Sequence, residues 1–409
     1  MTITEEKQIL AEFINNIPST LSGPDRVEYI CISIEKIDPD IRMQLVQLFN
    51  RFLVNMIEKE ASDIEVGGFG NSSYIWMRIH GEKQRALDLP QFSNDEAAVI
   101  IVNLLNSKQR DLLIENRNLD FSYTFYYERR KTNVRFRADA YFDLDTLTLN
   151  MRAINTSIRP LESLGFHPNA IKMMSHSYIK FGLSLVTGIT GSGKSTTLDS
   201  IVDYHNKSDN AHIVIIASPI EYVHKSNSCI IKHREVGRDV PTFKDGVIQA
   251  LRQDPDIIIV GEMRDPETIM AALEVTDTGH KVFSTLHTSS ATESLDRIIA
   301  EMHPNEQERV RNRLADVLIS VVSQKLVPTL DGKRILAKEV LLMTPSIKAA
   351  IKNNNLSEIY MMLNQGGPQG MITMEQDLKR LYLQKKISLE SAMAFANNKT
   401  RMKQLLSVV

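Results

Sequence analysis

Cysteine is almost absent from this sequence, with only two among its 409 residues. Cys31 and Cys229 stand alone, so the sequence offers no C-x-x-C zinc or redox pair, and such sparse use suits a reducing cytoplasm. A strong charge of one sign is missing as well, because the formal net charge is −2. This balance provides no bulk positive field to recruit nucleic acid or an anionic membrane. It disfavours a DNA-binding motor, although it leaves room for a local basic patch.

Long hydrophobic runs and low-complexity segments are missing too. The most apolar run, AAVIIVNLL at residues 97–105, is too short to span a bilayer, and the acidic start MTITEEKQIL lacks the basic region of a signal peptide. What is present, 43% hydrophobic and 24% charged residues, is typical of globular proteins, and the length predicts two or three domains. We therefore expect a cytoplasmic protein without direct insertion into a membrane.

The hydrophobic pattern changes twice within the first 181 residues. Residues 1–60 carry Ile, Leu, Phe and Met at three- and four-residue spacing, which predicts a helical N-terminal extension. This extension is either a docking or regulatory addition or a plain stabilising helical pair. Residues 61–154 combine short alternating strands with a helix at 95–107, which predicts a small α/β domain. Turn formers and proline in residues 155–181 predict a linker, with a hinge near Arg159 and Pro160.

The rest of the chain has the pattern of a larger α/β domain. Strand-length apolar runs alternate with helical segments in residues 182–330, which predicts a parallel sheet wound with helices. The last strong helical patterns lie at residues 306–326 and in a C-terminal region, residues 331–409, which we expect to form a helical cap. The predicted fold class is therefore α/β, with a large core and a smaller N-terminal domain.

A phosphate-binding loop is predicted within residues 183–201, LSLVTGITGSGKSTTLDSI, where GITGSGKS fits the pattern G-x-x-x-x-G-K-[ST]. An apolar strand precedes this pattern and a helical segment follows it. Glycines there let backbone N–H groups curl around phosphate oxygens at a helix N-terminus. We expect Lys194 to reach the β- and γ-phosphates and Ser195 to hold Mg²⁺. The predicted nucleotide-binding residues are Gly188, Thr190, Gly191, Ser192, Gly193, Lys194, Ser195 and Thr196.

Two carboxylates follow predicted strands of the same domain. Glu262 ends the strand in LRQDPDIIIVGEMRD, and the carboxyl end of a buried parallel strand is where ligands of open α/β sheets bind. We assign it a Walker B-like role beside Mg²⁺, with a surface acid as the alternative. Glu221 follows the strand in HIVIIASPIEYVHK. It is the candidate base that orients the attacking water, and an exposed turn residue is the alternative.

Two histidines flank the last predicted strand of the core, in TDTGHKVFSTLHTSSATESLDR. His280 precedes this strand and His287 follows it. Imidazoles in these places could reach the phosphates and report whether the γ-phosphate is present. The alternative is a structural role for each, which is common for an isolated histidine.

Together these residues resemble the motifs of one known family, and this likeness is more specific than a phosphate-binding loop alone. The resemblance is carried by GITGSGKSTTL, SPIEYVH, REVGRD, ALRQDPDIIIVGEMRDPET, TGHKVFSTLHTSSATESLDRI and QGMITMEQDLKRLYLQKKIS. They are similar to the Walker A, Asp box, Walker B, His box and C-terminal segments of the PilT-type type IV pilus retraction ATPases. That family belongs to the secretion-ATPase superfamily. The likeness is dense over residues 182–388 and fainter over residues 61–154.

The resemblance implies a PAS-like N-terminal domain, a RecA-like ATPase core of residues 182–330, and a homohexamer that binds ATP and Mg²⁺. Nucleotide-driven domain rotation would then power pilus retraction and twitching motility. The implied partner is the inner-membrane pilus platform protein, with other pilus ATPases as further candidates and no nucleic acid. The implied location is cytoplasmic, peripheral at the inner membrane through the pilus machine.

The family's functional residues map onto positions of this sequence. Glu221 matches the catalytic glutamate, Glu262 the Walker B acid, and His280 and His287 the His-box pair. Three arginines match the region from which the family directs guanidinium groups at nucleotide, and their planar fork suits phosphoryl oxygens. They are Arg135, Arg137 and Arg152.

The sequence also departs from the family pattern. Ala217 and Ser218 stand where two acids of the Asp box are usual, so Glu221 is the carboxylate that remains in that box. Ser284 replaces a usual glycine. The AIRNLI motif, tied to retraction, is present only as SIKAAI at residues 346–351. Serine before the proline also occurs in secretion and conjugation relatives, whereas the absence of a four-cysteine module favours retraction over extension.

Three other functions stay open on the sequence alone. The first is a related ATPase of a type IV secretion or conjugation system, with the same chemistry and a different load. The second is a RecA-like DNA motor, and the third is a nucleotide-gated binding module that hydrolyses little.

Overall fold

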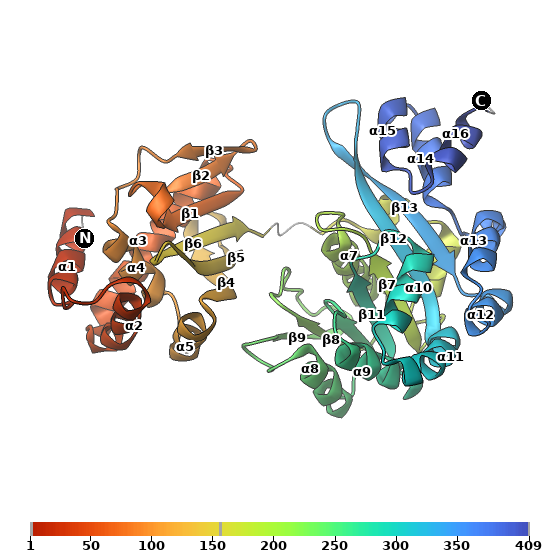
Figure 1. The fold of residues 1–409 in the computed structure, drawn as a ribbon, viewed down its shortest axis with the longest axis horizontal. Coiled ribbons are helices and arrows are strands. Elements are labelled where there is room, and N and C mark those ends of the chain that lie inside the picture. Colours follow the sequence, from red (N-terminus) through yellow and green to blue (C-terminus); the bar gives the residue numbers. More distant parts are fainter. Residues whose placement is uncertain (1–2, 155–157, 408–409) are drawn as a thin grey trace. The chain divides into compact units, whose positions relative to one another are not determined.

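The structure, a computed structural model, describes residues 3–154 and 158–407. The chain divides into two compact units, residues 1–156 and 157–409. Each unit has its own sheet and its own hydrophobic core (Figure 1). This arrangement confirms the predicted α/β class with a smaller N-terminal domain.

The first unit is a six-stranded antiparallel sheet in the order β3-β2-β1-β6-β5-β4. Helices pack on one face of it, while the other face carries polar side chains. The strands are β1 (Asp63–Gly67), β2 (Trp76–Ile79), β3 (Glu82–Arg85), β4 (Asn118–Tyr127), β5 (Thr132–Asp143) and β6 (Thr146–Ala153), and the helices are α1 (Ile3–Asn15), α2 (Gly23–Ser33), α3 (Pro39–Glu58), α4 (Asn94–Asn103) and α5 (Ser107–Asn116).

The N-terminal helices share the core of this sheet. Phe49 and Phe52 of α3 lie in one buried cluster with Phe136 of β5 and with the helix α4. Residues 3–58 are therefore part of the first unit rather than a separate domain. The apolar run of residues 97–105 lies mostly in α4, whose capping box is formed by Ser93 and Glu96 and which packs against β6.

The second unit is a seven-stranded sheet in the order β13-β12-β7-β11-β10-β8-β9. All neighbouring strands are parallel except β12 and β13. The central strands are buried on both faces, as expected when helices cover both sides of a parallel sheet. The strands are β7 (Gly182–Thr187), β8 (His212–Ala217), β9 (Ile230–Glu235), β10 (Ile257–Val260), β11 (Lys281–Leu286), β12 (Leu318–Pro328) and β13 (Arg334–Leu342).

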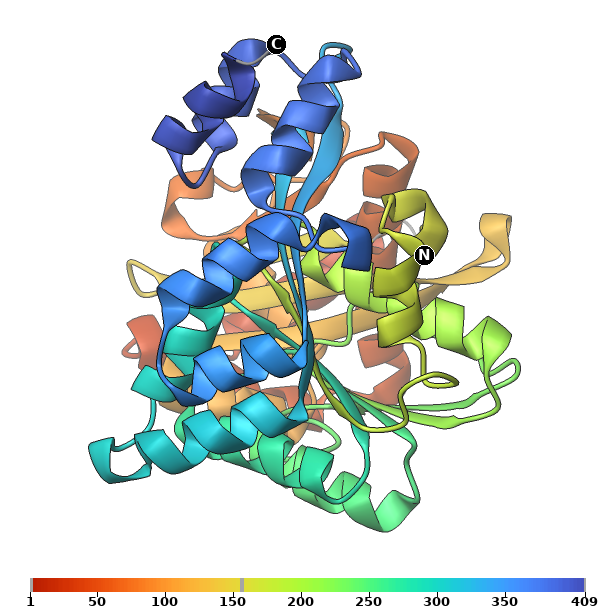
Figure 2. The same ribbon diagram turned by 90° about the vertical axis from the view of Figure 1, so that its right-hand side faces the viewer.

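Helices surround this sheet and form a separate group at the C-terminus (Figure 2). The C-terminal group has its own small core, which includes Met374, Leu378 and Met402. The helices are α6 (Pro168–Met174), α7 (Lys194–Ser208), α8 (Phe243–Ala250), α9 (Pro266–Asp277), α10 (Ala291–Ala300), α11 (Gln307–Val317), α12 (Pro345–Lys352), α13 (Leu356–Gln365), α14 (Met374–Leu383), α15 (Leu389–Phe395) and α16 (Lys399–Leu406). Within residues 3–154 and 158–407, none of the helices combines the length and the apolar character that a bilayer span requires.

The predicted helix at residues 306–326 and the all-helical region at 331–409 are both wrong in part. The helix α11 ends at Val317, and residues 318–328 and 334–342 form the antiparallel pair β12 and β13. Seven consecutive residues from Leu318 are buried because this part of β12 is covered on both faces. A strand buried on both faces shows no alternation, so its apolar run cannot be distinguished from a helix by period.

Most of the predicted linker, residues 155–181, is folded. Residues 155–157 lie outside the described residues. Arg159 and Pro160 are described and precede the first folded turn of the second unit, and their role as a hinge stays a prediction. From Leu161 onward, a short 3₁₀ turn (Leu161–Leu164) and the helix α6 contribute Leu161, Ala170 and Met174 to the core of the second unit.

Candidate functional site

The predicted phosphate-binding loop lies between β7 and α7, with Lys194 as the first residue of the helix. Gly188, Gly191 and Gly193 all have positive φ angles, of +149°, +79° and +90°. A Cβ at Gly188 would overlap Ser192 Oγ and lie 2.5 Å from the carbonyl oxygen of Gln324. The loop thus has the tight curl, closing on a helix N-terminus, that phosphate binding requires.

The side chains of this loop fit a bound phosphate chain. Lys194 Nζ donates to Gly188 O at 2.8 Å and to Ile189 O at 3.3 Å, so the ammonium group lies over its own loop. Burial lowers the pKa of Lys194, and the carboxylates of Glu262 and Glu221 act in the opposite direction. Ser192 Oγ is buried without a hydrogen-bond partner in the described part of the chain, as expected of a group that faces a ligand site.

Glu262 lies where the sequence predicted it, directly after β10 at the carboxyl edge of the sheet. Its backbone is fixed by the neighbouring Gly261, which donates from its N–H to Ile216 O at 2.8 Å and accepts from Thr285 Oγ1 at 2.6 Å. The charge of Glu262 raises the pKa of Lys194, in agreement with a position of both side chains at the carboxyl edge of the sheet. Asp or Glu near a phosphate-binding loop is the usual protein contribution to Mg²⁺ binding.

Two basic side chains lie near one oxygen of Glu262. Arg264 Nη2 lies 2.9 Å from Glu262 Oε2, and His287 Nε2 lies 3.8 Å from the same atom. Burial lowers the pKa of His287, and the nearby charges of Lys194 and Arg264 lower it further. These effects favour the neutral imidazole. Sequence reasoning missed Arg264, although its place two residues after Glu262 was the signal available.

Glu221 lies on the exposed loop that follows β8, and its carboxylate acts electrostatically on Lys194. The loop is held on two sides. Glu235 of β9 accepts from Ile220 N at 3.2 Å, and His224 Nε2 lies 3.0 Å from Asp199 of α7. These contacts fix the chain on either side of Glu221 and link its loop to the helix that begins at Lys194.

The structure separates the two predicted histidines. His280 precedes β11 at its amino end, whereas His287 follows the carboxyl end, where the phosphate-binding loop lies. The two histidines are seven residues apart along this strand, and seven residues of extended chain span about 20 Å. His280 Nδ1 instead lies 2.9 Å from Thr278 Oγ1 and 3.3 Å from Val275 O. A strand places its two ends at opposite edges of the sheet, so within one chain His280 lies away from the phosphate-binding loop. A role for His280 at the phosphates stays a prediction.

The three predicted arginines belong to the first unit. Arg137 of β5 and Arg152 of β6 are cross-strand partners on the polar face of that sheet. Arg152 Nε lies 2.7 Å from Asp63 Oδ1, and Arg137 Nη2 lies 3.4 Å from Asp120 Oδ1. Arg135 lies two residues before Arg137 and therefore on the same face. Their contact with nucleotide stays a prediction.

Gln324 is a further residue that sequence reasoning missed. This buried amide on β12 donates from Nε2 to Ser192 O at 3.0 Å and accepts from Thr197 Oγ1 at 3.0 Å. It supports the phosphate-binding loop from the neighbouring strand. The only signal in the sequence was a glutamine close to the apolar run of this strand.

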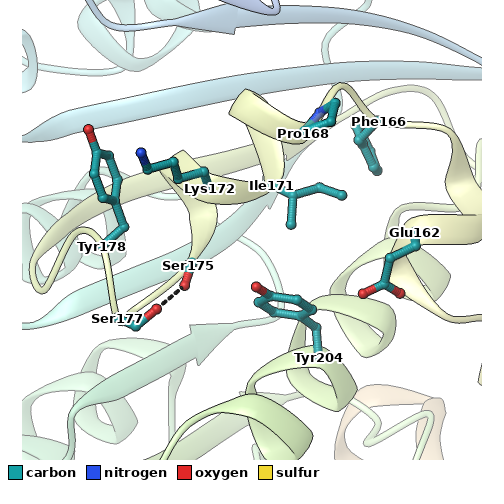
Figure 3. Close-up of a pocket in the computed structure, with 9 residues that line it drawn as sticks. All are labelled: Glu162, Phe166, Pro168, Ile171, Lys172, Ser175, Ser177, Tyr178 and Tyr204. Atoms are coloured by element: carbon teal, nitrogen blue, oxygen red, sulfur yellow. Dashed lines mark hydrogen bonds between the residues drawn. The ribbon is translucent and has the colours of Figure 1, made fainter.

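A cavity of 680 Å³ lies elsewhere in the second unit (Figure 3). Its lining includes Tyr204 of α7, Ile171 of α6, and Ser175, Ser177 and Tyr178 of the segment after α6, and the hydroxyl groups of Ser175 and Ser177 lie 2.7 Å apart. This segment leads to the amino end of β7, whereas the phosphate-binding loop follows the carboxyl end. None of the predicted site residues lines the cavity.

A P-loop between a central parallel strand and a helix, with an acid at the end of a nearby strand, defines the class of P-loop nucleotide-binding proteins. Comparison with known proteins is more specific. The family model for the type II/IV secretion system protein matches residues 40–339. The chain belongs to this family.

Two relatives and one solved structure extend this assignment. The chain is 38% identical to the twitching motility protein of Neisseria gonorrhoeae, over 80% of this chain and 85% of the relative. It is 39% identical to the type IV pilus retraction ATPase PilT of Pseudomonas aeruginosa, over 77% and 89%. A crystal structure of the pilus retraction motor PilT with bound ADP matches with a TM-score of 0.77 and 36% identity, over 86% of this chain and 98% of that one. These matches confirm the PilT-type resemblance.

Proposed function

We propose that this chain is an ATP-hydrolysing motor that powers the retraction of type IV pili. One observation carries the proposal: the chain is similar over most of its length to PilT, both in sequence and in fold. The site supports it, because Glu262 and His287 lie near each other and the charges of Glu262 and Glu221 both act on Lys194 in the phosphate-binding loop. The ADP bound in the PilT structure supports ATP as the nucleotide.

Each residue of the site has a proposed role. Lys194 and the loop N–H groups bind the phosphates, and Ser195 and Glu262 hold Mg²⁺. When bound, Mg²⁺ neutralises charge that develops on the phosphoryl oxygens. Glu221 orients the attacking water and accepts its proton. His287, in its neutral form, donates a hydrogen bond toward the γ-phosphate, while Arg264 keeps Glu262 oriented.

The finer parts of the mechanism belong to the same proposal. We propose a homohexamer in which hydrolysis drives a rotation of the two units about the segment that joins them. Arg135, Arg137 and Arg152 would supply guanidinium groups from the first unit. The pilus platform protein at the inner membrane would be the partner that receives the motion, with other pilus ATPases as further candidates, and the chain would act at the cytoplasmic face of that membrane.

A related ATPase of a type IV secretion or conjugation system is the second candidate function. The family description, which covers type II and type IV secretion, favours it over other classes. A RecA-like DNA motor has less support, since the formal net charge is −2. Added DNA should leave ATP turnover unchanged under our proposal, whereas a DNA motor would show salt-sensitive stimulation.

The load can be identified by imaging labelled pili on cells that lack this gene. Complementation with the wild-type gene and with Lys194→Ala provides the comparison. Abundant pili that never shorten, restored to retraction only by the wild-type gene, would support the proposal. Cells without pili would indicate an extension motor, and normal pilus dynamics would indicate secretion or conjugation.

A further inference from the structure

The loop that follows β11 carries His287 and is held by contacts from three directions. Ser289 N donates to Glu293 Oε2 of α10 at 2.7 Å. Ala291 N donates to Glu339 Oε1 of β13 at 2.8 Å. The third contact comes from the C-terminal helices, where Asn397 Nδ2 donates to Ser289 O at 3.1 Å. These contacts hold the loop and the start of α10 and thereby restrict the position of His287.

Asn397 lies in the turn between α15 and α16, and both ends of its amide are used. Its Oδ1 accepts from Lys325 Nζ at 2.6 Å, and the same ammonium group donates to Phe395 O at 2.8 Å. Lys325 is on β12, and this strand contacts α15. One side chain therefore joins the C-terminal helices to the sheet and to the loop of His287.

The same strand also supports the phosphate-binding loop. Gln324 and Lys325 are consecutive residues of β12, so their side chains point to opposite faces. Gln324 contacts Ser192 in the phosphate-binding loop, and Lys325 contacts Asn397. The phosphate-binding loop and the loop of His287 are thus both connected to β12, on its two faces.

The contact made by Asn397 is not needed to hold the C-terminal helices together. Their packing rests on buried apolar residues, among them Leu378, Leu381 and Met402. Asn397 itself is exposed. Its replacement should therefore leave the helices folded and remove only its hydrogen bonds to Ser289 and Lys325.

We propose that Asn397 is a positioning residue for ATP hydrolysis, which fixes the loop of His287 through Ser289 and ties that loop to β12 through Lys325. This inference rests on the proposed ATPase function. It makes the C-terminal helices a part of the catalytic apparatus, although none of their residues touches the phosphate-binding loop in the described contacts. ADP binding should be independent of Asn397, because ADP lacks the γ-phosphate that His287 faces.

Two variants of the full chain separate the two ends of the amide. Asn397→Ala removes both contacts. Asn397→Asp keeps an acceptor for Lys325 but cannot donate to Ser289 O, and it places a negative charge beside that carbonyl. Asn312→Ala, at an exposed position of α11, is the matched control. The measurements are kcat and KM for ATP, the Kd of ADP by calorimetry, and the Tm of each variant.

Both Asn397 variants should lower kcat by about fivefold, the effect of losing one neutral hydrogen bond in the transition state. Their ADP affinity should stay within about twofold of wild type, and Asn397→Asp should have the higher Tm of the two. Wild-type kcat in Asn397→Asp, or equal losses of kcat and ADP affinity in both variants, would overturn the inference. Failure of the proposed function gives a different result, because the wild-type chain itself would then hydrolyse no ATP.

Discussion

Replacing Gly188 by alanine tests the geometry of the phosphate-binding loop. The φ angle of Gly188 is +149°, and the new Cβ would overlap Ser192 Oγ and lie 2.5 Å from Gln324 O. Gly191 is the matched comparison, since its φ is +79° but nothing lies within 4 Å of a Cβ there. Strain from positive φ costs both variants about 1 kcal/mol. Only Gly188→Ala adds an overlap, and overpacking of this kind costs about 1–3 kcal/mol.

The difference should be visible in nucleotide binding. If the loop relieves the overlap by moving, Gly188→Ala should bind ADP with Mg²⁺ roughly five- to hundredfold more weakly than Gly191→Ala, as measured by calorimetry. Gly237→Ala, with φ +84° and open space around the Cβ, controls for glycine replacement outside the loop. Equal ADP affinity in Gly188→Ala and Gly191→Ala, with equal Tm, would refute the reasoning.

Three further predictions concern the proposed base Glu221, the buried amide of Gln324 and the buried amine of Lys281. Glu221→Gln should lower kcat at least about a hundredfold with a near-normal Kd for ADP, and unchanged turnover would exclude it as the general base. Gln324→Leu leaves Ser192 O and Thr197 Oγ1 without their buried partner, so thermal unfolding should show a loss of about 2 kcal/mol. Burial lowers the pKa of Lys281 to about 7, and the charge of Asp209 acts in the opposite direction. Three backbone carbonyls accept hydrogen bonds from its Nζ. The unfolded amine binds more protons above pH 7, so stability to urea should rise by about 1–2 kcal/mol from pH 7 to 9, and Lys281→Met should remove that rise.

The phosphate-binding loop could be predicted from sequence because all of its determinants lie in one short segment. The strand, the glycines, Lys194 and the helix follow each other within residues 183–201, and local chemistry alone specifies the curl. Glu262 was predictable for a similar reason, since a carboxylate directly after a buried strand has one place to lie in a parallel sheet.

Other parts of the site depend on contacts between distant segments. Gln324 meets Ser192 across 132 residues, and Asn397 meets Ser289 across 108, so no local pattern announces either pair. The likeness of His280 to a motif does not specify the edge of the sheet at which it lies, because that depends on the end of β11 that the residue flanks. The strands β12 and β13 were missed because burial on both faces removes the alternation that identifies a strand.

The central claim is that the edge of the sheet beside Lys194 hydrolyses ATP. The most direct test is ATP turnover by the purified full chain with Mg²⁺, compared with Lys194→Ala and Glu262→Gln at matched folding, judged by Tm. We predict turnover by the wild-type chain and a loss of at least about a hundredfold in each variant. Turnover that is unchanged in either variant, or absent from a wild-type chain that binds ADP, would contradict the account.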